Sequence, residues 1–141
     1  MKNAKRLTIL FVLISLLAVI LAAQSANAQG SYECTGDFEA TVHQGVDAGW
    51  SLVGELTLSV DDSGAAEGVL TLQDGQTVVA AGQVNGRAIN LVFTVSENTY
   101  IFGVGTSLND FSTCDSIVGG PLVGPNPGDS GDWGYALGGR S

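Results

Sequence analysis

The chain has few basic residues, and most of them lie at its extreme N-terminus. Of five lysines and arginines in 141 residues, three stand at positions 2, 5 and 6. Only Arg87 and Arg140 accompany the 14 acidic residues, all of which lie beyond residue 28. Binding to nucleic acid or to an anionic lipid surface needs basic side chains near phosphates, so neither function is expected. The absence of lysine after residue 5 also excludes Schiff-base chemistry in the mature protein.

Potential metal ligands are equally scarce. The sequence holds one histidine, His43, and two cysteines, Cys34 and Cys114. One imidazole and two thiols that are expected to pair with each other are too few for a zinc site. The aspartates lack the spacing of an EF-hand calcium loop and fall in short turn-like segments. We therefore expect no metal site and no cofactor.

One apolar run dominates the N-terminus. Three basic residues precede the run from Leu7 to Ala23, and the small-residue sequence Ala26-Asn27-Ala28 follows a short polar stretch. These are the three parts of a cleavable secretory signal, so residues 1–28 are predicted to be a helical signal peptide. The product, residues 29–141, would be secreted or extracytoplasmic. The run is near the shortest helix that spans a bilayer, about 17 residues, so an uncleaved anchor is the alternative.

An exported chain meets an oxidising compartment, where a pair of thiols is expected to form a disulfide. We therefore predict a bond between Cys34 and Cys114, with two separately buried free thiols as the alternative. The bond would tie together two distant parts of the chain.

Beyond the signal, apolar and polar residues alternate with a period of two, which is typical of half-buried β-strands. Asp74-Gly75 and Asn85-Gly86 are strong hairpin signals between such segments. No segment has the 3.6-residue period of an amphipathic helix. The expected strands are residues 33–43, 50–60, 67–73, 76–84, 87–95, 99–107 and, more weakly, 132–137.

These strands follow one another too closely for crossover helices, so the pairing must be antiparallel between neighbours. A Cys34–Cys114 bond would bring the first strand to the end of this meander. We therefore predict one all-β domain that closes toward an up-and-down barrel of seven or eight strands, with a two-sheet β-sandwich as the alternative. Residues 119–131 contain all three prolines and are predicted to form a loop.

One short string suggests catalysis. Gly128-Asp129-Ser130-Gly131 resembles the sequence around the nucleophile of chymotrypsin-type serine proteases. The likeness covers four residues, the following Asp132-Trp133 departs from the Gly-Gly-Pro of that family, and the chain has about half the required length. A hydrolase using Ser130 is therefore a remote alternative, and we expect no enzyme.

The aromatic residues are the remaining candidates for a site. Aromatic side chains can line the mouth of a small barrel, stack on a sugar or anchor a protein partner, and they can equally fill the core. The candidate ligand-binding residues are Trp50, Tyr100, Trp133 and Tyr135. Small inward residues such as Gly54, Ala80 and Gly82 leave room either for neighbouring rings or for a ligand. The sequence thus favours a non-enzymatic binding module for a small apolar ligand, a glycan or a protein; a structural or surface protein without a pocket is the alternative.

Overall fold

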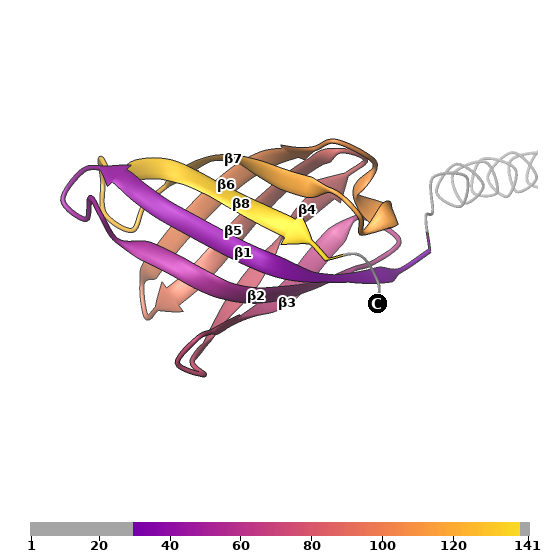
Figure 1. Ribbon diagram of the computed structural model, residues 1–141, viewed down its shortest axis with the longest axis horizontal. Helices are drawn as coiled ribbons and strands as arrows, with labels where there is room; N and C mark the ends of the chain where they lie inside the picture. Colours follow the sequence, from indigo (N-terminus) through magenta and orange to yellow (C-terminus); the bar gives the residue numbers. More distant parts are fainter. Residues whose placement is uncertain (1–29, 139–141) are drawn as a thin grey trace, which may run out of the picture.

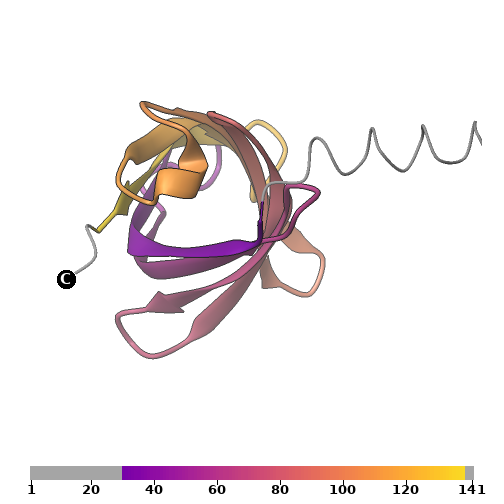
Figure 2. The same cartoon turned by 90° about the vertical axis from the view of Figure 1, so that its right-hand side faces the viewer.

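The computed structural model describes residues 30–138, so the predicted signal peptide lies outside the described residues. Eight antiparallel strands close into a barrel in which each strand pairs with its neighbours in sequence and β1 pairs with β8 (Figure 1). Seen toward one end, the strands form a ring (Figure 2). The strands are β1 (Tyr32–Gln44), β2 (Ser51–Val60), β3 (Ala65–Leu72), β4 (Thr77–Asn85), β5 (Ala88–Ser96), β6 (Thr99–Ser107), β7 (Ile117–Val123) and β8 (Ser130–Leu137). The predicted all-β class and closed up-and-down barrel are confirmed.

Alternation of side chains divides each strand between the interior and the outside of the barrel. Large apolar residues fill the interior from every strand, among them Phe38, Leu56, Leu91, Phe93 and Tyr135, each at most 1% exposed. The rings of Phe38 and Phe93 lie 4.7 Å apart between centroids, which brings β1 and β5 together across the barrel. The interior is therefore a packed core.

The barrel is narrow enough that strand backbones nearly touch at several glycines. A Cβ atom on Gly82 would collide with the carbonyl oxygen of Asn90 on β5, and one on Gly131 would collide with the carbonyl oxygen of Thr41 on β1. Glycine permits strong bending of the strands, which a small closed sheet requires. The same holds at Gly54, where the neighbouring backbone at Thr71 fills the space.

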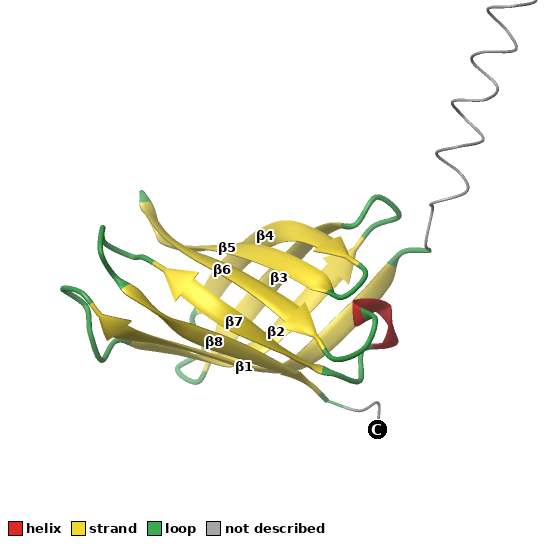
Figure 3. Ribbon diagram, turned by 90° about the horizontal axis from the view of Figure 1, so that it is seen from above, coloured by secondary structure: helices red, strands yellow, loops and turns green. Residues whose placement is uncertain are grey.

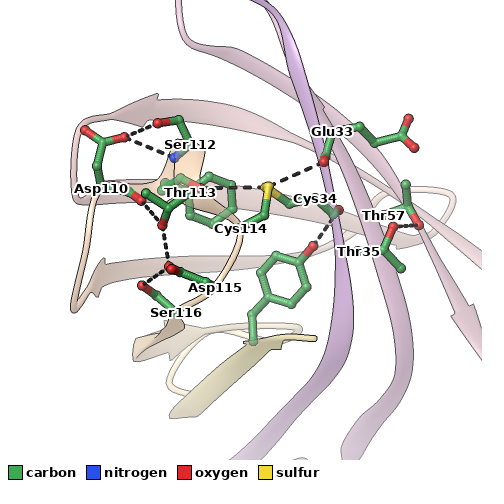
Figure 4. Close-up of a disulfide and its surroundings, with 12 residues drawn as sticks. Glu33, Cys34, Thr35, Thr57, Asp110, Ser112, Thr113, Cys114, Asp115 and Ser116 are labelled. Atoms are coloured by element: carbon green, nitrogen blue, oxygen red, sulfur yellow. Dashed lines mark hydrogen bonds between the residues drawn. A yellow bond between two sulfur atoms is a disulfide. The ribbon is translucent and has the colours of Figure 1, made fainter. Parts of the chain in front are cut away.

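A short 3-10 helix, η1 (Phe111–Thr113), covers one end of the barrel (Figure 3). Phe111 is fully buried, and its ring lies 6.2 Å from that of Tyr135. Cys114 ends this helix and forms the predicted disulfide with Cys34 of β1, with Cα atoms 5.3 Å apart (Figure 4). The bond thus fastens the β6–β7 connection to the first strand, while backbone pairing with β8 closes the ring.

The region predicted as a proline- and glycine-rich loop is shorter than expected. Residues 119–123 belong to β7 and residues 130–131 to β8, so the prediction of a loop over 119–131 is wrong at both ends. Pro121 is tolerated in β7 because the regular pairing between β7 and β6 is interrupted there. The pair Gly103–Leu122 and the pair Thr106–Gly119 are formed, but no pair is formed between them. A residue without an N–H costs no hydrogen bond where the ladder is already interrupted.

The indole of Trp133 contacts β6 in the segment where the pairing between β6 and β7 is interrupted. Its Nε1 donates to the carbonyl oxygen of Val104, at 3.1 Å, from inside the barrel. The ring lies against Gly103 and Gly105, where a Cβ atom would fall within 2.8 Å of it. Glycine on β6 therefore makes room for the largest interior side chain.

No helix within residues 30–138 has the length and apolar character needed to span a bilayer. The disulfide is compatible with an extracytoplasmic location, because such bonds persist mainly in oxidising compartments.

Replacing both Cys34 and Cys114 with alanine is expected to lower the free energy of unfolding by about 4–5 kcal/mol, from the loop entropy of a bond that spans 80 residues. Urea unfolding followed by tryptophan fluorescence measures the loss. A loss below about 1 kcal/mol would mean that this bond contributes little to the barrel.

Gly82→Ala is expected to lower the free energy of unfolding by about 1–3 kcal/mol, because a Cβ there forces β4 and β5 apart. Gly134→Ala is the matched control: it also lies in a strand, but its Cβ would approach nothing closer than 4.0 Å. Its effect should stay within about 0.5 kcal/mol. Equal losses in the two variants would contradict the close approach of the backbones.

Candidate binding surface

Two of the four aromatic residues predicted to bind a ligand are part of the core. Trp133 is 4% exposed and Tyr135 is fully buried. The Tyr135 hydroxyl lies 2.8 Å from the carbonyl oxygen of Cys34 and 2.9 Å from that of Leu56, which share its proton. Burial, together with the charges of Glu33 and Glu55, raises the pKa of Tyr135, so the phenol stays protonated and keeps donating. Neither ring is available to a ligand from outside.

The other two aromatic residues lie elsewhere. Trp50 precedes β2 and packs, partly buried, against the edge of the core. Tyr100 lies on the outer side of β6 and is 52% exposed. The structure therefore does not bring the four aromatic residues into one site, and a ligand role for Trp50 or Tyr100 stays a prediction.

The sequence left open whether the small interior residues make room for neighbouring rings or for a ligand, and at the two glycines the structure shows the backbone of the next strand instead. Backbone atoms of the neighbouring strands occupy the positions that side chains at Gly54 and Gly82 would take. Ala80 is fully buried among the core residues. The two glycines thus permit the close approach of neighbouring strands.

Ser130, His43 and Asp132 all lie on the outside of the barrel near the end of β1. The His43 Nε2 atom lies 3.0 Å from the Asp132 carboxylate, and both side chains are more than half exposed. Within residues 30–138, no hydrogen bond joins the Ser130 hydroxyl to His43. A serine nucleophile needs its imidazole within hydrogen-bond reach. The arrangement is therefore a surface contact between a histidine and an aspartate, next to a serine that does not join it.

Asp129 is the one buried carboxylate among the described residues, and it holds two loops together. It accepts hydrogen bonds from the backbone N–H of Asn126, at 2.8 Å, and of Asp47, at 3.1 Å. Burial by itself raises the pKa of Asp129, but these N–H donors more than offset it, so the pKa lies below its ordinary value of 3.8. The Gly-Asp-Ser-Gly string thus has a structural use: its aspartate fastens the β7–β8 loop to the β1–β2 loop.

The outer surface of the barrel has two unlike halves. The first, here called the acidic face, is the outer side of β8, β1, β2 and β3. On it Asp37 lies directly opposite Glu55 in the antiparallel register, and Glu39 lies opposite Val53. A hollow of about 710 Å³ runs over these residues. Like charges directly opposite each other repel and destabilise a sheet, and water weakens this repulsion. The acidic face is therefore suited to remaining exposed to solvent. Among residues 30–138, no group of three or more potential metal-ligating side chains is found.

The second half, here called the uncharged face, is the outer side of β4, β5, β6 and β7. These four consecutive strands contain no charged residue. Phe102 lies opposite Val92 on one side and Val123 on the other, and Val92 lies opposite Ala81. An apolar row therefore crosses all four strands. The exposed large apolar residues of this face are Val79 (60%), Tyr100 (52%), Phe102 (40%), Val104 (45%), Ile117 (64%) and Val123 (52%).

Sequence reasoning singled out Tyr100 but missed Phe102 and its neighbours. A signal for them exists, because residues 77–107 carry a charge at only two positions, Arg87 and Glu97, and both lie in turns. Alternation alone does not reveal which side of β6 faces water, because both sides are apolar.

Comparison with known proteins adds no family to this description. No model of a protein family matches the chain, and no curated protein matches it either.

The carboxylate of Asp129 makes the stability of the barrel depend on pH. Because its pKa is depressed in the folded state, the stabilisation is present above pH 3.8 and is lost as pH falls below that value. Asp129→Asn should therefore lower the melting temperature at pH 7, and the gap to wild type should narrow as the pH falls below 3.8. Thermal melts followed by circular dichroism at several pH values check this. Asp62→Asn, which removes an exposed carboxylate, is the control and should melt like wild type; a gap for Asp129→Asn that does not change with pH would contradict the assignment.

Proposed function

We propose that this protein is an exported, non-enzymatic binding module that recognises a protein partner through the uncharged face of its barrel. The observation that carries the proposal is the run of four charge-free strands with Phe102 exposed near its centre. Contiguous exposed apolar surface is rare on soluble monomers and marks sites of interaction.

A ligand inside the barrel is less well supported than a partner outside it. The interior positions are filled by core side chains, and glycines bring the strand backbones into contact. An interior ligand needs an enclosed cavity of about 300 Å³ or more, and packed side chains occupy that space here. Binding is therefore best supported on the outer surface.

The composition of the uncharged face favours a protein over a glycan. Sugar sites combine a stacked aromatic ring with several directed polar groups, whereas Phe102 is bordered along its row by Val92 and Val123. Aromatic and aliphatic side chains at the centre of a patch are typical of protein interfaces.

Support for export comes from the disulfide and from the basic-apolar-small pattern of residues 1–28. The acidic face fits a protein that must remain soluble outside the cell, because net charge opposes non-specific association. If the uncharged face packs within a larger surface assembly, the protein is instead a structural component, which is the second candidate.

A photoreactive phenylalanine analogue at position 102 tests the proposal in the organism that encodes the protein. We expect irradiation to give a covalent adduct with another protein chain, because the analogue would lie within the interface. Val53 is the matched control position: its exposure of 38% is close to the 40% of Phe102, but it lies on the acidic face. Adducts that form equally at both positions, or at neither, would contradict a partner on the uncharged face.

A further inference from the structure

We propose that the partner on the uncharged face is a second copy of this chain, related by a twofold axis that passes near Val92 and sets the two β5 strands antiparallel to each other. This inference rests on the proposed function, since it names the partner for the same surface.

The distribution of charge restricts how two copies can approach each other. Every charged residue within a strand lies on β1, β2, β3 or β8. Contact through the acidic face would bring the carboxylates of Asp37, Glu39 and Glu55 against those of the other copy, where like charges repel strongly at short range. Contact through the uncharged face instead keeps the carboxylates of both copies on the far sides of the pair. Two copies of so acidic a chain are therefore best joined at the uncharged face.

Two residues of opposite charge flank β5, one in the turn at each end of the strand. Arg87 immediately precedes β5 and Glu97 immediately follows it, and both are exposed. Val92, in the outward-facing row, lies midway between them in the sequence. In a twofold pair each surface patch meets its own copy, so a group at one end of a strand meets the group at the other end. An axis near Val92 would therefore set Arg87 of each copy against Glu97 of the other.

Arg87 is anchored but lacks a carboxylate partner. Its Nε donates to the carbonyl oxygen of Ser107, at 2.8 Å, which holds the guanidinium group beside the end of β6. The contact between His43 and Asp132 is the one contact of a basic residue with a carboxylate found among residues 30–138, so no described carboxylate pairs with Arg87. Arginine binds carboxylates through two parallel hydrogen bonds, which suits it to an interface. A carboxylate from a second copy would complete its contacts.

The centre of the proposed contact is apolar. The row of Ala81, Val92, Phe102 and Val123 crosses the middle of β5, and it would pack against the same row of the second copy. Apolar centres with charged groups at the rim are the usual anatomy of protein interfaces, and the rim charges chiefly select the partner and fix the orientation.

Charge exchange tests this arrangement. Sedimentation equilibrium of the oxidised mature protein at low salt should show a monomer–dimer equilibrium. Arg87→Glu and Glu97→Arg should each weaken dimerisation at least about tenfold, because each sets like charges against each other twice in the symmetric pair. The double variant should recover most of the affinity. Glu67→Arg, the same substitution on the acidic face, is the control and should dimerise as wild type does.

A wild-type protein that stays monomeric, or a double variant no better than the single ones, would overturn the inference. Photocrosslinking at position 102 separates this failure from failure of the proposed function. An adduct of twice the monomer mass supports a second copy. An adduct of any other mass overturns the second copy but leaves a protein partner in place, and no adduct overturns both.

Discussion

Backbone pairing between β1 and β8 turns a meander of hairpins into a closed barrel, and most other features of the molecule depend on it. The pairing runs from Gly36–Leu137 to Gln44–Ser130, with one irregularity near the end of β1. It removes both edges of the sheet, which would otherwise be open to pairing with other chains. It also encloses the interior, so that only the outer surface and the ends remain accessible. Any recognition must therefore use the outer surface or the end loops.

Closure of eight strands into a narrow barrel has a second consequence. The strands bend sharply at interior glycines, and their backbones approach so closely that a methyl group would not fit at Gly82 or Gly131. Trp133 packs against two further glycines, Gly103 and Gly105, and donates its indole hydrogen to the carbonyl oxygen of Val104. The glycine content of the sequence thus reflects close packing. The same packing explains why small interior residues do not indicate a pocket.

Much of the fold could be predicted from the sequence because period-two alternation and the turns Asp74-Gly75 and Asn85-Gly86 mark the strands directly. The disulfide followed from export and from the presence of two cysteines. The strand β7 was missed because proline and glycine are poor strand formers. A proline fits in β7 only because the pairing with β6 is interrupted at Pro121. The aromatic residues were a weaker guide. A tryptophan or tyrosine is equally suited to a core and to a site, and the structure places Trp133 and Tyr135 in the core.

The separation of acidic and uncharged halves is the feature from which a function can be argued, and what it predicts most specifically is contact between two copies of the chain at the uncharged face. Nuclear magnetic resonance with a soluble paramagnetic agent tests it directly, because the agent relaxes methyl groups in proportion to their access to solvent. In an isolated barrel, Val79 is 60% exposed and Val123 is 52% exposed, against 38% for Val53 on the acidic face. If two copies meet at the uncharged face, Val79 and Val123 are relaxed less than Val53 at high protein concentration. Relaxation that follows the exposures of the isolated barrel at every concentration would contradict it.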